Sequence, residues 1–209
     1  VEAELAGRVL AHLEKGLPAR SFQANGDEEK EFIRSWFLLT TKPVIYALNI
    51  SEDDIGKPED SLPHLAAVRA AAVQEGAETL TISAAIEQEV AALEPKEKAE
   101  FLQELGIGRS GLDRLVQRSY SLLGLISFLT VGEDECRAWT VTRGTKAPQA
   151  AGKIHTDFEK GFIRAEVVSY PVLKELGSMA ACREKGLIRS EGKEYIMQDG
   201  DVVLFRFNV

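Results

Sequence analysis

The sequence is poor in cysteine and lacks long apolar runs, and both shortages limit what the protein can be. Two cysteines, Cys136 and Cys182, are too few for a disulfide framework or a zinc site with four cysteine ligands. We therefore expect a reducing compartment, the cytoplasm. The longest apolar stretch, Leu122–Leu129, is far shorter than the roughly 18 residues of a membrane-spanning helix. No basic segment typical of a secretion signal opens the chain.

Positive charge is also scarce. The 209 residues include 25 lysines and arginines and 33 acidic residues, which gives a net charge of −8. The acidic excess lies in the first 124 residues, because the rest of the chain holds 12 basic and 12 acidic residues. This distribution disfavours a protein that binds nucleic acid over its whole surface. It allows a local basic patch in the second half.

Groupings typical of a metal centre or a catalytic nucleophile are missing as well. The three histidines, His12, His64 and His155, are scattered without a second ligand at helical spacing, so we expect no metal site. Neither cysteine has a histidine close to it in sequence, so a thiol nucleophile is not supported. We assign no catalytic residue in this chain.

The first 124 residues alternate helical patterns with two short strands. Apolar residues recur at helical spacing in six segments: 2–15, 28–39, 65–75, 84–90, 95–105 and 111–123. In the second of these, the pattern places Phe32, Ile33, Trp36 and Phe37 inward, and Ser110 is the expected N-cap of the last. The runs 43–48 and 79–83 predict strands, the first covered on both faces. Strand, helix and strand in this order predict a parallel βαβ unit.

After Gly124 the pattern becomes that of a small mixed sheet, and we place the domain boundary there. Strands are predicted at 125–130, 137–143, 162–169, 195–197 and 202–207. Helices are predicted at 149–158 and 170–185, the second broken at Gly177. This order is typical of an α+β sheet crossed by one main helix, a β-grasp arrangement.

Polar groups follow both predicted strands of the first half. Asn49 and Glu52 come directly after the first strand, and Ser83-Ala84-Ala85 ends the second. Ligands of parallel α/β sheets bind beyond the carboxyl ends of strands, so these two loops could grip the edge of a heterocyclic base. The same residues also suit an ordinary turn in which Glu52 begins a helix. The spacing alone leaves both interpretations open.

Longer strings resemble one known family, the YchF/Obg-like ATPases, which are P-loop NTPases of the TRAFAC class. Lys42-Pro43-Val44-Ile45-Tyr46-Ala47-Leu48-Asn49-Ile50-Ser51-Glu52 resembles their base-recognition segment, with Asn-x-x-Glu in place of the commoner Asn-Lys-x-Asp. Ser83-Ala84 matches their second base-contacting loop. The second half resembles their TGS domain, a ubiquitin-like β-grasp module, in the segments Arg137–Thr140, Gly144–Gly152, Ile154–Glu159, Gly161–Val167 and Gln198–Asp201.

The resemblance implies a domain plan and a nucleotide site. Residues 1–40 would form a helical neck, 41–124 the C-terminal part of a nucleotide-binding domain at the end of a parallel P-loop sheet, and 125–209 the TGS domain. The base would be contacted by Asn49, Ile50, Glu52, Ser83, Ala84 and Ala85. The intact protein would bind ATP or GTP with Mg²⁺ and hydrolyse ATP.

The expected preference for ATP follows from the hydrogen-bonding edges of the bases. Guanine presents two N–H donors that suit a carboxylate at the reach of Asp, and Glu52 is one methylene longer. Ile50 stands where a Lys would lie over the base. Adenine presents a ring acceptor and one exocyclic donor, which Asn49 and backbone groups can hold.

The phosphate-binding part of such a protein is missing from these residues. No Gly-x-x-x-x-Gly-Lys-Ser/Thr segment occurs in the sequence, so neither a phosphate cradle nor its Mg²⁺ ligand is expected here. We therefore expect the C-terminal portion of a longer protein, inactive alone as an ATPase.

Basic and aromatic residues interleave in the second half. Trp139 and Phe162 lie among five basic residues, Arg137, Arg143, Lys146, Lys153 and Arg164. Such a surface can hold RNA phosphates and stack on unpaired bases, but the two rings could equally belong to the core. The family's association with ribosomes favours contact with the ribosome or its RNA. The rival interpretation is a non-enzymatic β-grasp module that binds RNA or has a regulatory role.

Overall fold

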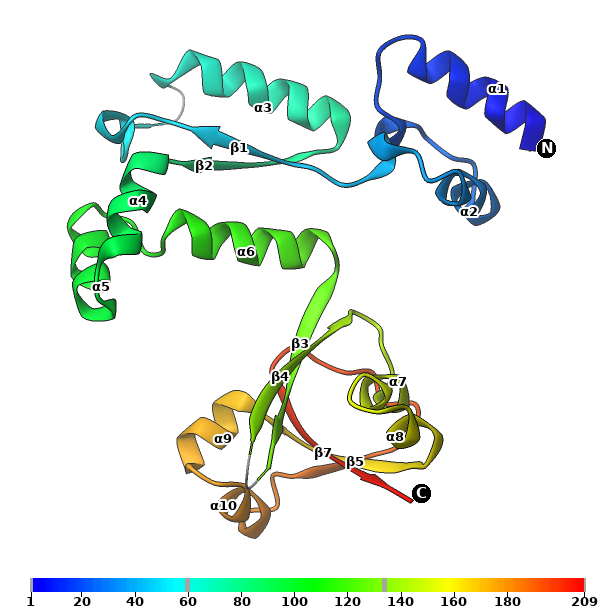
Figure 1. Ribbon diagram of the computed structural model, residues 1–209, viewed down its shortest axis with the longest axis vertical. Coiled ribbons are helices and arrows are strands. Elements are labelled where there is room, and N and C mark those ends of the chain that lie inside the picture. The colour runs from blue at the N-terminus through cyan, green and yellow to red at the C-terminus, as the bar shows by residue number, and fades with distance from the viewer. Residues whose placement is uncertain (1, 59–60, 133–134, 209) are drawn as a thin grey trace. The chain divides into compact units, whose positions relative to one another are not determined.

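The computed structural model describes residues 2–58, 61–132 and 135–208. The chain divides into two compact units, residues 1–119 and 120–209, with the boundary inside the helix that spans residues 111–122 (Figure 1). None of the helices in the described part of the chain is both long enough and apolar enough to span a membrane.

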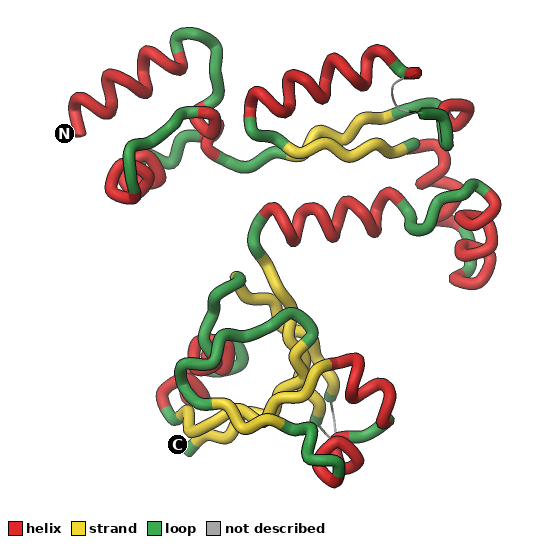
Figure 2. The backbone as a smooth tube through the Cα atoms, turned by 180° about the vertical axis from the view of Figure 1, so that it is seen from behind, coloured by secondary structure: helices red, strands yellow, loops and turns green. Residues whose placement is uncertain are grey.

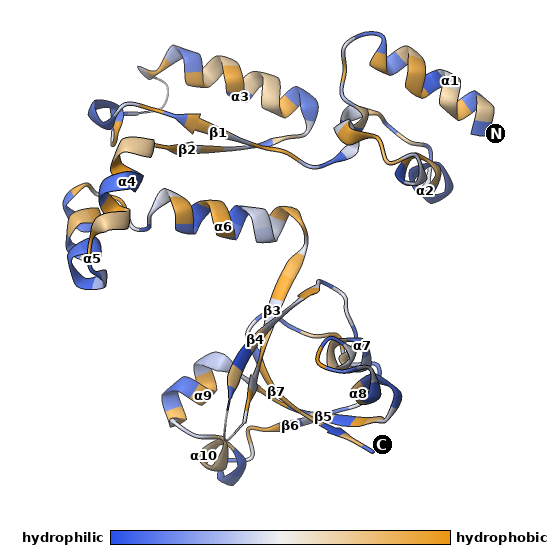
Figure 3. Ribbon diagram, viewed as in Figure 1, coloured by the Kyte–Doolittle hydropathy of each residue, from blue (hydrophilic) through white to orange (hydrophobic). Residues whose placement is uncertain are grey.

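The first unit begins with two helices, α1 (Glu2–Leu13) and α2 (Asp27–Ser35). Along α1, hydrophobic and hydrophilic bands alternate (Figure 3), and its buried residues pack against α2 in a cluster of Leu5, Val9 and Ile33. The inward position predicted for Phe37 is wrong, because its side chain is 88% exposed. α2 ends at Ser35, and Phe37 has a positive φ of 51°, which turns the chain out of the helical path.

A parallel strand pair follows, as predicted. β1 (Ile45–Asn49) pairs with β2 (Glu78–Ile82) in parallel, connected by α3 (Pro63–Glu75) (Figure 2). The prediction that the first strand is covered on both faces is wrong. Leu48 is buried against α3, whereas Ala47 points to the other face and is exposed, because successive side chains of a strand alternate.

Three more helices complete the first unit: α4 (Ala84–Ala92), α5 (Pro95–Glu104) and α6 (Gly111–Leu122). α4 and α5 pack through Ile86, Val90 and Leu102. The predicted cap of α6 is confirmed, since the Ser110 hydroxyl accepts a hydrogen bond from the backbone N–H of Asp113 at 3.1 Å.

The second unit is built on a five-stranded mixed sheet. Its strands are β3 (Leu125–Val131), β4 (Cys136–Thr142), β5 (Phe162–Ser169), β6 (Arg189–Glu191) and β7 (Asp201–Phe207). They lie in the order β4-β3-β7-β5-β6, with the central β3 and β7 parallel and the other neighbours antiparallel. The strand predicted at 195–197 is wrong, because only an isolated bridge joins Ile196 to Lys146. β6 was not predicted, since Arg-Ser-Glu carries no apolar alternation.

Helices cover both faces of this sheet. α7 (Ala147–Gly152) and α8 (Thr156–Lys160) lie on one side, and α9 (Tyr170–Leu176) and α10 (Met179–Glu184) lie on the other (Figure 1). The α7 side carries the larger core, with Ile126, Phe128, Val167 and Val203 nearly inaccessible to solvent. A smaller cluster on the other side includes Cys182.

The helix predicted over residues 149–158 is wrong as one element, because the chain breaks it into α7 and α8. The two short helices pack so closely that a Cβ on Gly152 would collide with the carboxylate of Glu159. His155 is the N-cap of α8, and its Nδ1 accepts a hydrogen bond from the backbone N–H of Asp157 at 3.2 Å. The His155 ring therefore has a structural role at the start of α8.

Candidate nucleotide-base site and basic surface

The loops that follow β1 and β2 lie side by side and are joined by hydrogen bonds. Asn49 stands opposite Ile82 in the strand register, and the backbone N–H of Ile50 donates to the carbonyl of Ile82 at 2.9 Å. The side-chain Oδ1 of Asn49 accepts a hydrogen bond from the backbone N–H of Ala84, also at 2.9 Å. The structure therefore brings the two loops together at the carboxyl ends of parallel strands.

The hydrogen bond to Ala84 fixes which part of the Asn49 amide faces outward. With Oδ1 engaged, the remaining capacity of the exposed side chain is the pair of donors on Nδ2. Ala84 and Ala85 are exposed in the first turn of α4, where backbone N–H groups have no partner within the helix. This edge can offer donors from Asn49 and from the α4 backbone to an acceptor atom of a ring.

The two remaining polar residues of the predicted set differ in burial. Glu52 is exposed and begins the 3₁₀ turn Glu52–Asp54, which the Ser51 hydroxyl caps by accepting from the Asp53 N–H at 3.4 Å. Ser83 is buried, and its hydroxyl has no hydrogen-bond partner among the described residues. A buried hydroxyl without a partner is uncommon, because desolvation then goes uncompensated.

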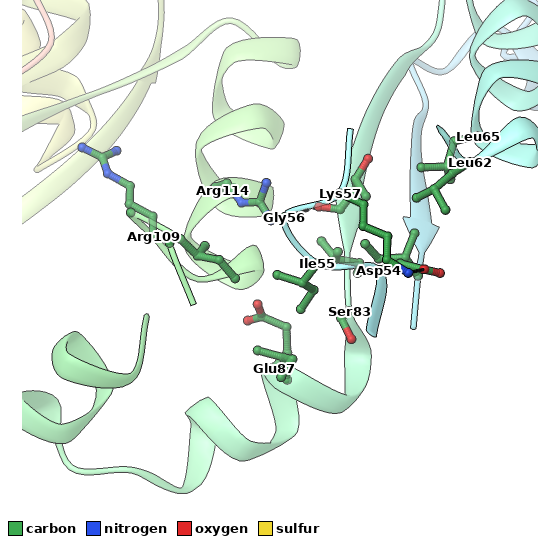
Figure 4. Close-up of a pocket in the computed structure, with 17 residues that line it drawn as sticks. Asp54, Ile55, Gly56, Lys57, Leu62, Leu65, Ser83, Glu87, Arg109 and Arg114 are labelled. Carbon is green, nitrogen blue, oxygen red and sulfur yellow. Dashed lines mark hydrogen bonds and ion pairs between the residues drawn. The ribbon is translucent and has the colours of Figure 1, made fainter. Parts of the chain in front are cut away.

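A cavity of about 340 Å³ opens beside the joined loops (Figure 4). Ile50 and Ser83 of the predicted set line it, whereas Asn49, Glu52 and the two alanines do not. Its other walls come from the loop 54–57, from α4 and from the loop 106–109. Sequence reasoning missed these two loops, although Gly56, Gly106 and Gly108 were their available signal. The volume lies at the small end of ligand pockets.

Charged groups in the cavity wall are held by internal partners. The Glu87 carboxylate accepts hydrogen bonds from the backbone N–H groups of Gly111 and Leu112 and so caps α6. Glycine at position 111 leaves room for this contact, because a Cβ there would lie 2.7 Å from Glu87 Oε1 and 2.9 Å from Ile82 Cγ2. Arg114 Nη2 donates to the Thr81 carbonyl at 2.9 Å.

Two further cations line the wall of the cavity. Lys57 Nζ pairs with Asp54 Oδ1 at 2.8 Å, and this hydrogen bond raises the pKa of Lys57. Arg109 extends away from the other labelled residues in Figure 4. The described residues hold no group of three or more His, Cys, Asp or Glu that could bind a metal ion.

The basic residues predicted in the second half do not share one face of the sheet. On β4, Arg137 lies on the same face as Trp139, and its guanidinium sits 4.2 Å from the centroid of the Trp139 ring. That face carries α7. On β5, Ala165 points to the α7 side, so Arg164 points to the opposite side.

The other members of the set are exposed around the turns that follow β4 and α7. Arg143 and Lys153 are both exposed, and Lys146 Nζ forms an ion pair with Glu194 Oε2 at 2.6 Å. Of the two aromatic rings, Phe162 is buried in the core, whereas Trp139 is half-buried and donates to Thr130 Oγ1 at 3.0 Å. Only Trp139 therefore leaves part of its ring accessible beside an arginine.

Comparisons with known proteins place these observations in a family. The family model YchF-GTPase_C, described as "Protein of unknown function (DUF933)", matches residues 125–208. Over 208 residues, the chain is 49% identical to "Ribosome-binding ATPase YchF" of Bacillus subtilis and 46% identical to the protein of that name from Haemophilus influenzae. The chain belongs to the YchF family. The resemblance recognised in the sequence is thereby confirmed.

Relatives of the YchF family match this chain throughout but are longer. All of the chain and 56% of each bacterial relative are aligned, so the chain spans little more than half of their length. "Obg-like ATPase 1" of Oryza sativa subsp. japonica is 42% identical over 210 residues, which are 52% of its length. The solved structure of the Schizosaccharomyces pombe YchF GTPase superposes with a TM-score of 0.81 at 36% identity. It covers 97% of this chain and 53% of its own. The α/β fold with its mixed sheet is thus that of a YchF protein.

Proposed function

We propose that this chain is the C-terminal portion of a ribosome-binding ATPase and that it supplies the nucleotide's base site. The hydrogen bond from the Ala84 N–H to Asn49 Oδ1 carries the proposal, because it joins the two loops at the ends of parallel strands, where nucleotides bind in α/β sheets. The names of the relatives, ribosome-binding ATPase and Obg-like ATPase, support the same activity.

The base contacts would come from Asn49, Ile50, Glu52 and the segment Ser83-Ala84-Ala85. Asn49 Nδ2 and the first N–H groups of α4 are donors, which suit the ring acceptor of adenine. Guanine instead needs a carboxylate acceptor for its two donors, and exposed Glu52 is one methylene longer than the Asp that fits them. We therefore expect ATP to bind more tightly than GTP.

The phosphates and Mg²⁺ would be held outside these 209 residues. The sequence contains no Gly-x-x-x-x-Gly-Lys-Ser/Thr segment, and the described residues contain no cluster of metal ligands. When bound, Mg²⁺ would neutralise the charge that develops on the phosphates during hydrolysis. This chain's own contribution is to orient the base, and it would be inactive as an ATPase by itself.

The domain plan is part of the proposal. Residues 1–40 are a helical neck, 41–124 complete a P-loop-type parallel sheet, and 125–209 form a TGS domain of the β-grasp type. The strand order β4-β3-β7-β5-β6 supports the last assignment, since the first and last strands of a β-grasp domain lie parallel at its centre.

The TGS domain would contact ribosomal RNA in the cytoplasm. Exposed Arg143, Lys146 and Lys153, together with Arg137 stacked on Trp139, offer cations and part of an aromatic ring. Arg164 would contribute from the other sheet face. The double substitution Arg143→Ala and Lys146→Ala should weaken co-sedimentation of the intact protein with ribosomes and flatten its salt dependence.

The nucleotide assignment is tested by titrating the intact protein with ATP and GTP. Tighter binding of ATP supports it, and tighter binding of GTP contradicts it. Glu52→Asp should shift the preference toward GTP only partly, because Ile50 still replaces the Lys that lies over guanine. The upstream reading frame of the gene separates this proposal from a non-enzymatic module: a Gly-rich phosphate loop supports the enzyme, and an in-frame stop supports the module.

A further inference from the structure

Three arginines converge on one carboxylate in the second unit. Arg164 on β5, Arg206 on β7 and Arg183 on α10 all point toward Glu166 of β5, on the sheet face that carries α9 and α10. Arg206 donates two hydrogen bonds to the carboxylate, from Nε at 3.1 Å and from Nη2 at 3.3 Å. Arg183 Nη2 donates to it at 3.3 Å, and Arg164 Nη2 at 3.4 Å.

The carboxylate organises the cluster without neutralising it. The side chain of Glu166 is 13% exposed, whereas those of the three arginines are 48–58% exposed. Each guanidinium has five N–H donors, so most donors of the cluster remain directed to solvent. Three positive charges against one negative charge leave a net charge of +2. The hydrogen bond from Arg206 also holds the pKa of Glu166 below its ordinary value, so the organising charge persists at neutral pH.

The arrangement is unfavourable for stability alone. Arg164 and Arg206 stand directly opposite each other in the antiparallel register of β5 and β7. Like charges in such a cross-strand pair disfavour a sheet, and Glu166, which pairs with both arginines, opposes their repulsion. Two arginines at one cross-strand position point to a role outside folding.

The strands beside the cluster carry little other acid, although exposed Glu184 follows Arg183 on α10. By strand alternation, Glu166 is the one acidic residue that the five described strands place on this face. β4 adds the exposed hydroxyl-bearing side chains Thr140 and Thr142 on the same face. α9 and α10 cover an apolar cluster on this face, and the three arginines remain about half exposed. Guanidinium groups held at the surface in this way fit an extended polyanion better than a small molecule in a pocket.

We propose that Arg164, Arg183 and Arg206 form a binding surface for the phosphate backbone of RNA, held in place by Glu166. This rests on the proposed ribosome contact and deepens it, because it adds a second sheet face to the residues around Arg143. Guanidinium forks match phosphate oxygens in geometry, and phosphates stay ionised at neutral pH. An acidic protein segment is the competing partner, and the experiment separates the two.

The test measures binding of the 209-residue chain to a fluorescein-labelled 20-nucleotide RNA hairpin by anisotropy, over a range of salt concentrations. The triple variant Arg164→Gln, Arg183→Gln, Arg206→Gln should lose about tenfold or more in affinity at 0.1 M salt, and its salt slope should fall by about two to three. The matched control Lys160→Gln, Lys174→Gln, Lys193→Gln changes the net charge equally and should lose less than about threefold.

A second triple variant keeps the positive charge but replaces each guanidinium group with an ammonium group. Arg164→Lys, Arg183→Lys, Arg206→Lys should keep the salt slope within about one and still lose several-fold in affinity, since lysine cannot make paired hydrogen bonds to phosphate. This variant carries the test if the glutamine triple fails to fold, which circular dichroism reveals.

Several outcomes would overturn the inference. They are no RNA binding by the parent chain at 50 mM salt, equal losses in the glutamine triple and its lysine-site control, or displacement of RNA by polyglutamate of equal charge. If the double variant Arg143→Ala, Lys146→Ala abolishes RNA binding while the arginine variants retain it, the proposed ribosome contact around Arg143 is supported. The proposal for Arg164, Arg183 and Arg206 is then contradicted. The nucleotide titration of the intact protein is independent of all these results.

Discussion

The two units of the chain are built to different degrees of completeness. The second unit packs helices against both faces of a five-stranded sheet, and twelve buried residues form its main core. The described residues of the first unit form a two-stranded sheet and three separate clusters with three buried residues each. Large apolar side chains such as Phe37, Leu39 and Val73 stay exposed in it. Both units leave large apolar side chains exposed, and the difference between them lies in the core: one large cluster in the second unit, and small separate clusters in the described part of the first.

The largest expected loss of stability comes from truncating a core side chain of the second unit. Phe128 is inaccessible to solvent, and its ring meets the Phe205 ring edge-on at 5.9 Å between centroids. Phe128→Ala should destabilise the second unit by about 3–5 kcal/mol, because it leaves a cavity in a continuous core. Chemical denaturation followed by near-ultraviolet and far-ultraviolet circular dichroism measures this.

The matched substitution in the first unit is Leu48→Ala. Leu48 belongs to a small cluster at the start of α3, so the loss should fall at or below about 2–3 kcal/mol, the low end for buried leucine. Equal losses for Phe128→Ala and Leu48→Ala would contradict the difference between the units.

A glycine substitution tests the close packing between α4 and α6 in the first unit. Gly111→Ala places a methyl group against Glu87 and Ile82, and we expect a cost of about 1–3 kcal/mol from overpacking. Gly108→Ala is the control, since no atom lies within 4 Å of its added Cβ. The thermal unfolding midpoints of the two variants are compared. Equal midpoints would show that the close contact at Gly111 does not affect stability.

The hydrogen bond between the two loops gives a smaller expected effect on stability. Asn49→Ala leaves the Ala84 N–H without its partner and should cost about 1 kcal/mol. Asn49→Asp keeps an acceptor oxygen and should retain the loop geometry while removing the Nδ2 donors.

In the intact protein both Asn49 variants should weaken ATP binding. If Asn49→Asp binds ATP as tightly as the parent protein, Nδ2 has no part in base recognition. Isothermal titration calorimetry provides the measurement.

The smallest expected effect is on how the stability of the second unit depends on pH. The Arg206 hydrogen bond lowers the pKa of Glu166 in the folded state, so its contribution is present above the unfolded pKa, near 4.5. That contribution is lost as the pH falls from there through the lower folded-state pKa. Glu166→Gln should flatten the acid limb of the stability curve by less than about 1 kcal/mol, because the pair is partly solvated. Urea unfolding between pH 3 and pH 7 tests this, and an unchanged acid limb contradicts it.

The parts of the fold that sequence predicted well depend on neighbours a few residues away. The parallel pair of β1 and β2 followed from a strand–helix–strand order, and the Ser110 cap followed from one hydroxyl before a helical pattern. The turn at Phe37 was missed, because its apolar ring fits a helical period that the backbone there abandons.

Other errors came from contacts that the sequence does not display. The chain is broken between α7 and α8, and Glu159 of the second helix packs against Gly152 of the first. β6 exists because Arg189–Glu191 pairs with β5, and not because of its own pattern.

The same division holds for the candidate sites. Asn49 and Ser83 could be selected because each ends an apolar strand, and long matching strings indicated the family. The cavity walls at 54–57 and 106–109 come from loops far apart in the chain and could be assembled only by folding. The arginine cluster unites residues 164, 183 and 206, which no spacing rule connects.

Most local elements, the family and the polar residues at the strand ends could be predicted from the sequence, because these depend on side chains within a few positions of one another. Folding was needed to bring the Ala84 N–H to the Asn49 amide, to place Arg137 and Arg164 on opposite faces, and to gather three arginines around one glutamate. These are contacts between distant segments, and sheet register and helix packing place them.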